Sequence, residues 1–147
     1  MDDYLKYWKV IRQYVKIKYG LNQADLDMIL FLYSEAYFNK DKFDEFTRLV
    51  GWDAKRFKRM LKEGWLESFR KHDPKTHRRA LYKLSFKAKH LVTLIYKYLS
   101  GEQLIAESYV NNPLMLRKNK RYRDAVMRGA VLKLNDSIRQ QQHHARE

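Results

Sequence analysis

Hydrophobic residues recur at helical spacing along most of the chain, and short polar or glycine-containing breaks separate the periodic stretches. The first stretch, Tyr4–Lys18, predicts a helix that Gly20 ends. The second predicts a helix whose N-cap is Asn22 and whose buried stripe is Leu26, Ile29, Leu30 and Tyr33. Both stretches indicate amphipathic helices that cover a core.

Two short helical stretches follow, and each comes after an aspartate that can cap it. Asp41 precedes Lys42–Val50, whose predicted buried side chains are Phe43, Phe46 and Leu49. Asp53 precedes Ala54–Glu63, whose predicted buried side chains are Phe57, Met60 and Leu61. A tight turn at Gly51 joins the two helices. We expect the large aromatic residues to be core anchors, in particular Trp8, Tyr14, Trp52 and Trp65.

The period then changes to that of strands. Trp65–Arg70 and Arg79–Leu84 alternate as two strands around a polar loop, which predicts a β-hairpin. The helical period returns after Ser85, over Phe86–Leu99, and resumes beyond Ser100-Gly101 as far as Tyr109.

A break at Asn111-Asn112-Pro113 separates residues 1–110, the predicted main domain, from a basic helical extension over 111–147. The extension should contain a helix over Lys118–Gln141, with frayed residues after it. Only five Gly and two Pro are available for turns, so the fold class is mainly α with one small hairpin.

Charge is concentrated in the middle of the chain. The 31 basic and 17 acidic residues give a net charge of +14, which favours polyanionic partners. Residues 52–99 alone contain 14 basic and 4 acidic residues, a net of +10. An even spread would be expected if the charge served solubility alone.

The cations of this middle segment lie on the second short helix and on the hairpin loop. We expect Lys55, Arg56 and Arg59 to approach bases in a DNA major groove, and Lys58 and Lys62 to meet phosphates. The loop adds four cations that could follow the backbone or enter the minor groove, namely Lys71, Lys75, Arg78 and Arg79. Arg79 could instead pair with Glu67. The alternative reading for the whole helix is a solvated charged face.

Two short helices followed by a hairpin are typical of a winged helix-turn-helix, and two runs of residues make the resemblance more specific. They are Lys62-Glu63-Gly64-Trp65-Leu66-Glu67 and Arg78-Arg79-Ala80-Leu81-Tyr82-Lys83-Leu84-Ser85. Residues 22–99 resemble the multiple-antibiotic-resistance regulator (MarR) family of bacterial winged-helix transcription factors. The resemblance implies a homodimer on a near-palindromic operator, with Arg78 as the wing arginine in the minor groove. The predicted dimer contacts are Tyr7, Ile11, Tyr14, Leu94, Tyr98, Tyr122, Val126 and Leu134.

No enzymatic chemistry is predicted. The sequence has no glycine-rich phosphate loop and no Ser/His/Asp set, and it has no cysteine for a disulfide or a thiolate metal site. His72 and His77 lack a nearby carboxylate cluster, so we expect neither a metal nor a cofactor. A small-molecule effector among Tyr7, Tyr14 and Phe38 is a less favoured possibility, because a packed core would use the same residues.

The leading hypothesis is therefore a dimeric, MarR-like regulator that binds double-stranded DNA. The alternatives are an architectural or replication-associated nucleic-acid binder of viral or plasmid origin, and a winged-helix module for protein interaction. No apolar stretch approaches the ~20 residues of a membrane span, and the acidic start Met1-Asp2-Asp3 is unlike a signal peptide. We expect a cytoplasmic protein of a bacterial or phage-infected cell.

Overall fold

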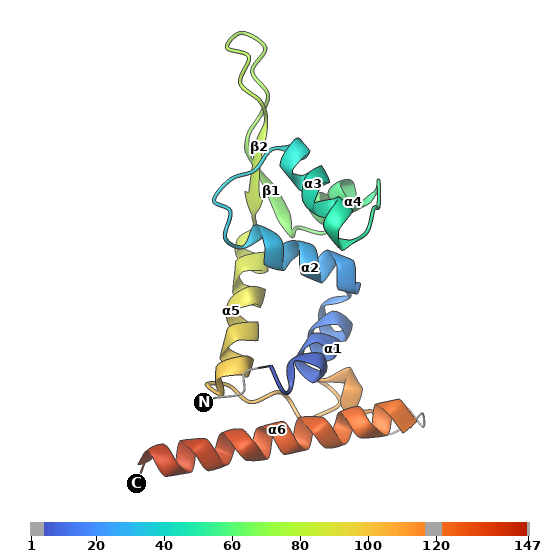
Figure 1. Ribbon diagram of the computed structural model, residues 1–147, viewed down its shortest axis with the longest axis vertical. Helices are drawn as coiled ribbons and strands as arrows, with labels where there is room; N and C mark the ends of the chain where they lie inside the picture. Colours follow the sequence, from blue (N-terminus) through green and yellow to red (C-terminus); the bar gives the residue numbers. More distant parts are fainter. Residues whose placement is uncertain (1–4, 117–121, 147) are drawn as a thin grey trace. The chain divides into compact units, whose positions relative to one another are not determined.

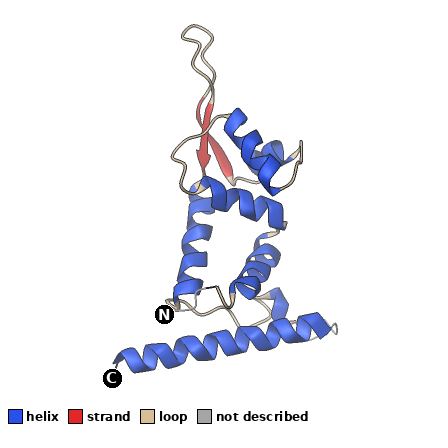
Figure 2. Cartoon of the chain, in the orientation of Figure 1, coloured by secondary structure: helices blue, strands red, loops and turns tan. Residues whose placement is uncertain are grey.

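The computed structural model describes residues 5–116 and 122–146, and these are mainly helical with one small antiparallel hairpin (Figures 1 and 2). The chain divides into two compact units. One comprises the described parts of Met1–Leu21 and Leu94–Glu147, and the other is Asn22–Thr93, the helix-hairpin unit. The division thus differs from the predicted one, because the described residues of 1–21 and residues 94–110 group with the C-terminal segment.

The helix-hairpin unit begins with α2, Gln23–Leu32. As predicted, Asn22 is its N-cap, and its side-chain oxygen accepts a hydrogen bond from the backbone N–H of Asp25 at 2.7 Å. Leu26, Ile29 and Leu32 are fully buried on this helix. Tyr33, expected in the same stripe, lies beyond the end of the helix and is exposed.

The next helix, α3, spans Lys40–Val50 and starts two residues before the predicted position. Its cap is Asn39, whose side chain accepts from the Lys42 N–H at 2.9 Å, so the prediction that Asp41 is the cap was wrong. Phe43 is buried as predicted. Leu49 was expected in the core, but it is 68% exposed on the outer side of the helix.

The fourth helix, α4, spans Arg56–Lys62 and begins two residues after the predicted start. Asp53 does not cap it in the usual way: its carboxylate accepts from the Lys55 N–H at 2.9 Å and so closes the turn before the helix. Met60 is buried, and the ring of Phe57 meets Phe43 and Tyr82 edge-on at 5.0 and 4.9 Å. These rings hold α4 against α3 and the hairpin.

The hairpin consists of β1, Leu66–Arg70, and β2, Leu81–Leu84, in antiparallel register. Leu66 faces Leu84, and a bulge between Ser68 and Arg70 leaves Phe69 without a register partner. A third chain segment joins the hairpin at one residue: Phe38 and Tyr82 exchange both backbone hydrogen bonds, at 3.0 and 2.8 Å. Trp65, just before β1, is buried as predicted. Figure 1 shows the loop of the hairpin projecting beyond the helices of this unit.

The other unit contains α1, Trp8–Tyr19, the short 3-10 helix η1, Pro113–Met115, and α6, Tyr122–Arg146. Helix α5, Phe86–Ser100, belongs to this unit from Leu94 onward. It ends at Gly101, whose φ of 80° is left-handed, so the predicted continuation to Tyr109 was wrong. The predicted fraying after residue 141 was also wrong, because α6 continues as helix through that segment.

A buried asparagine on α6 explains why residues 94–110 group with the C-terminal segment. The side chain of Asn135 accepts from the Ile105 N–H at 3.0 Å and donates to the Ile105 carbonyl at 2.8 Å. It therefore pairs with the backbone of Ile105 as a neighbouring strand would. Asn112 acts similarly on the carbonyl of Ala106, at 2.8 Å. These bonds hold the segment after α5 against the end of the chain.

Half of the predicted dimer contacts are buried inside one chain. Four of them are buried in the single protein chain: Ile11, Tyr14, Tyr98 and Leu134. The rings of Tyr14 and Tyr98 meet edge-on at 5.9 Å, and burial raises the pKa of both phenols. These four side chains are therefore covered within the single chain, and their contact with a partner chain stays a prediction. Tyr7 and Leu94 are half-buried, Val126 is 51% exposed, and the side chain of Tyr122 lies outside the described residues.

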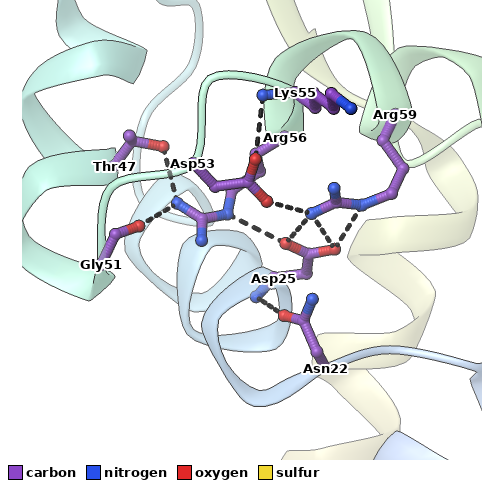
Figure 3. Close-up of polar contacts among 8 residues, drawn as sticks. All are labelled: Asn22, Asp25, Thr47, Gly51, Asp53, Lys55, Arg56 and Arg59. Carbon is purple, nitrogen blue, oxygen red and sulfur yellow. Dashed lines mark hydrogen bonds and ion pairs between the residues drawn. The ribbon is translucent and has the colours of Figure 1, made fainter.

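A buried carboxylate fixes α4 within the helix-hairpin unit (Figure 3). The side chain of Asp25 is 4% exposed and lies between two guanidinium groups of α4. It accepts from Arg56 Nε at 2.9 Å, and from Arg59 Nη2 and Nε at 2.8 and 3.1 Å. Arg56 Nη1 also donates to Thr47 Oγ1 at 2.9 Å and to the Gly51 carbonyl at 2.7 Å. We call these residues the Asp25 cluster. It links α2, α3, the following turn and α4.

The Asp25 cluster predicts that Arg56 is needed for stability. Because Arg56→Ala leaves the Asp25 carboxylate buried with one partner fewer, the free energy of unfolding should fall by about 3–5 kcal/mol. Lys58→Ala, an exposed neighbour on the same helix, should change it by no more than about 0.5 kcal/mol. Urea unfolding followed by tryptophan fluorescence measures both values. Equal stability of the two variants would contradict the role given to the cluster.

Candidate nucleic-acid interface

The nine cations predicted to touch DNA all lie in or beside α4 and the hairpin loop, which are consecutive elements of the helix-hairpin unit. Their environments differ, and these environments decide which of them can meet a ligand. Two are held in the Asp25 cluster and one is paired at the base of the loop. The other six are exposed, and residues 5–116 and 122–146 contain no side-chain partner for them. The six are Lys55, Lys58, Lys62, Lys71, Lys75 and Arg78.

Arg56 cannot approach a base as predicted. Its side chain is 3% exposed, and three of its donor bonds go to Asp25, Thr47 and the Gly51 carbonyl. Extracting this guanidinium would leave the Asp25 carboxylate underpaired in the interior, at a cost of several kcal/mol. The expectation for Arg56 is therefore corrected: it is a core residue of this unit.

Arg59 is partly engaged in the same way. Its side chain is 31% exposed and donates to Asp25 and, at 3.1 Å, to the Asp53 carboxylate. These carboxylates raise the pKa of Arg59. The Lys55 N–H and the Arg59 guanidinium lower the pKa of Asp53, so the pair is fully charged at neutral pH. Both edges of the guanidinium that present two nitrogens include Nη2, which these carboxylates already occupy, whereas Nη1 has no hydrogen bond among the described residues. A bidentate contact with guanine would therefore require Arg59 to leave Asp25 or Asp53, and base contact by Arg59 stays a prediction.

The lysines of α4 form the outward face of the helix. Lys55, Lys58 and Lys62 are all exposed, and the described residues contain no ion-pair or hydrogen-bond partner for their amino groups. Figure 3 shows the Lys55 side chain pointing away from the carboxylates that hold its arginine neighbours. Helical spacing of three to four residues places Lys55, Lys58 and Lys62 along one side. The result is a row of three unneutralised charges.

The hairpin loop carries the other three cations, and an aspartate orders it. The Asp73 carboxylate accepts from the Lys75 N–H and from the Thr76 hydroxyl, both at 2.9 Å. These bonds, the hydroxyl first, lower the pKa of Asp73. A backbone bond from the Asp73 N–H to the Arg78 carbonyl, at 3.0 Å, closes the loop. Lys71, Lys75 and Arg78 thus project from a loop of defined conformation, without a side-chain partner among the described residues.

Arg79 differs from its neighbours in the loop. It precedes β2 instead of starting a strand, and its guanidinium pairs with the Asp41 carboxylate in the first turn of α3. The predicted alternative partner, Glu67, pairs instead with Lys83 across the hairpin, at 3.4 Å. Both Arg79 and Asp41 are well exposed, so the bond contributes little to stability. Its effect is to join the base of the loop to the N-terminus of α3.

Four residues that position these cations were absent from the predicted site: Asp25, Thr47, Asp53 and Asp73. Asp25 follows a capping asparagine, so its position was fully explained by the preference for acidic residues at a helix start. Asp53 was expected at the turn but only as a cap. One signal was available, because Asp25 lies four residues before Ile29 and seven before Leu32, on the same face of the helix as these buried side chains, and a buried aspartate requires a cationic partner.

The structure also places the remaining residues that the sequence analysis considered. His72 and His77 are exposed, and no group of three His, Asp or Glu able to hold a metal occurs in residues 5–116 and 122–146. Phe38, suggested for an effector site, is packed against Phe43 and Tyr82. Trp52 was expected in the core, but it is 62% exposed.

Among the described helices, none combines the length with the apolar content that crossing a bilayer requires.

Comparison with known proteins leaves the geometry as the basis for a functional assignment. No protein-family model, curated protein or solved structure matches the chain.

Proposed function

We propose that the protein binds duplex DNA through the helix-hairpin unit, used as a winged helix-turn-helix. In this proposal α3 and α4 are the helix-turn-helix pair, and the β1–β2 hairpin is the wing. The order of the elements supports it, as does the bridge between Phe38 and Tyr82, because it adds a third chain segment to the small sheet.

The observation that carries the proposal is a set of six exposed cations on α4, on its N-cap and on the loop, none of which has a side-chain partner in the part of the chain that the structure describes. A protein of net charge +14 could present its charge anywhere on its surface. On α4, however, the two arginines are held by carboxylates, whereas the three lysines point into solvent. A row of cations together with a projecting basic loop is the charge pattern expected of a surface that binds the phosphate backbone of a duplex.

The kind of cation indicates how the duplex is bound. Arginine makes the commonest specific contact, a bidentate bond to guanine, whereas a lysine ammonium is a point charge suited to phosphate. With Arg56 and Arg59 engaged, α4 offers lysines to the duplex. We therefore propose that α4 contributes mainly affinity, and that Arg78 of the wing contributes sequence preference by sensing the width of the minor groove.

The MarR-like regulator remains the first reading of the biological role, and it requires a dimer and a bipartite operator. The burial of Arg56 and the pairing of Arg59 Nε and Nη2 with carboxylates favour the second reading, an architectural binder with weak sequence preference. Selection from a random duplex pool separates them. Enrichment of two half-sites about one helical turn apart, bound by a dimer, would support the regulator. Uniform recovery of all sequences would reject it in favour of the architectural binder.

The charge set predicts the salt dependence of binding. If the six cations each neutralise one phosphate, log K against log salt should have a slope of about −5 per protein chain. Changing Lys55, Lys58 or Lys62 singly to Ala should reduce the slope by about 1 and weaken binding equally for all sequences. Fluorescence anisotropy with a labelled duplex at several salt concentrations measures this. Lys89→Ala, an exposed lysine on α5, is the control, and an identical effect of this variant would contradict the assignment to α4.

The wing predicts a preference for duplexes with a narrow minor groove. Wild-type protein should bind an A-tract duplex more tightly than a G·C-rich duplex of equal length. Arg78→Ala should reduce that preference by about tenfold, a change of about 1.4 kcal/mol. Arg78→Lys should retain affinity but lose preference, because the ammonium lacks the planar donor set. Competition anisotropy with the two duplexes tests the wing, and equal affinity of wild type for both would rule out minor-groove readout by Arg78.

A further inference from the structure

Trp52, in the turn between α3 and α4, is the one tryptophan whose side chain is largely exposed to solvent. It is 62% exposed, whereas Trp65 is 1% exposed and Trp8 is half-buried. Leu49, one turn earlier on α3, is 68% exposed. An indole carries one of the largest apolar surfaces of any side chain, so leaving it in water costs stability that a contact would recover. Neither the fold nor the proposed set of cations explains its position.

The turn that carries Trp52 is held on both sides by α4. On one side, the Gly51 carbonyl accepts from Arg56 Nη1 at 2.7 Å. On the other, the Asp53 carboxylate accepts from Arg59 Nη2 at 3.1 Å and from the Lys55 N–H at 2.9 Å. The residues on each side of Trp52, through the Gly51 carbonyl and the Asp53 carboxylate, are therefore bonded to the helix that carries the lysine row or to its N-cap. The indole is presented from a fixed turn, which reduces the entropy lost when it makes a contact.

The charges near the indole favour a phosphate-bearing partner. The Arg48 guanidinium lies over the ring, with its Cζ atom 5.9 Å from the ring centroid. Lys55, an exposed cation without a partner among the described residues, follows three residues later. An apolar ring with a guanidinium over it and an exposed lysine three residues along the chain fits a sugar-phosphate backbone, in which deoxyribose and base edges alternate with negative charges. It fits an apolar protein surface less well, because the cations would lose their hydration there.

We infer that Trp52 is a DNA-contacting residue at the margin of the groove that α4 enters. This inference rests on the proposed binding of duplex DNA by α4 and the wing. The ring would cover a deoxyribose or a thymine methyl group, which is an apolar contact that displaces no counterion. In this arrangement the two arginines of the Asp25 cluster act on DNA indirectly: they position the indole and the lysines instead of touching the bases.

Quenching of tryptophan fluorescence by acrylamide tests the contact in the wild-type protein. The Trp52→Phe variant serves as the reference: subtracting its signal from the wild-type signal isolates Trp52 from the two less exposed indoles. Saturating duplex should reduce the quenching constant of Trp52 at least threefold and leave the remaining signal unchanged. An unaltered quenching constant at saturation would overturn the inference.

Binding by substituted proteins provides the second readout. Trp52→Ala should raise Kd about tenfold, and Trp52→Phe should raise it less, because the smaller ring retains part of the contact. The salt slope should stay at the wild-type value in both variants, in contrast to the lysine variants, since an apolar contact releases no counterion. Phe86→Ala, another exposed aromatic residue of the same unit, is the matched control and should leave Kd within twofold.

The outcomes separate this inference from the proposed function. A wild-type protein that binds no duplex refutes both. Tight, salt-dependent binding that Trp52→Ala leaves within twofold refutes the contact alone and makes a protein partner the better occupant of this surface. A Trp52→Ala variant whose loss of affinity comes with a smaller slope of log K against log salt also refutes an apolar contact, because that slope counts released counterions. Circular dichroism at the assay temperature establishes that each variant is folded.

Discussion

The helix-hairpin unit depends on a carboxylate that is removed from water and shared by two guanidinium groups. Burying an ionised aspartate costs several kcal/mol unless its oxygens are paired and hydrogen-bonded. Asp25 meets that condition because both arginines of α4 donate hydrogen bonds to its carboxylate. Arg56 also donates to the Thr47 hydroxyl and to the Gly51 carbonyl. Since α4 has only seven residues and no side-chain cap, this cluster and the packing of Phe57 and Met60 fix its position.

The Asp25 cluster also decides which charges α4 displays. Within a single turn of helix, arginines face the interior and lysines face solvent. The chemistry of the two side chains suits this division, because a planar guanidinium can bind two acceptors in a buried pair, whereas a hydrated ammonium is best left at the surface. The outward face is then suited to phosphates more than to base edges. Any sequence preference would have to come from the wing, from the turn at Trp52 or from the shape of the duplex.

Sequence periodicity predicted the helices and the hairpin because one side of each element faces the core and the other faces solvent, so apolar and polar residues alternate with the period of the element. The stripes of Leu26 and Ile29 on α2, and of Phe43 on α3, are buried as expected. The errors have a different origin. Arg56 lies one position from Phe57 in a helix with a narrow core stripe, so periodicity assigned it to the solvent side.

Only knowledge of Asp25, 31 residues earlier, shows why Arg56 points inward. Trp52 and Leu49 were assigned to the core from their apolarity alone, although residues near a turn can remain outside it. The four buried dimer candidates show the same limit, because periodicity finds an apolar face but not which surface covers it. Contacts between residues far apart in the sequence, such as Asp25 and Arg56, thus decide which side chains of the candidate site are exposed. A single sequence does not show these contacts.

The central claim, that the lysine row and the loop meet DNA while the Asp25 cluster stays closed, can be tested residue by residue. Heteronuclear NMR of the labelled protein would record backbone amides and the arginine Nε–H signals during titration with a duplex. The account predicts the largest shifts at Lys55, Lys58, Lys62 and Arg78, with the Arg56 Nε–H signal unmoved and still protected from exchange. A shifted or exchanging Arg56 Nε–H signal, or changes confined to the other unit, would contradict it.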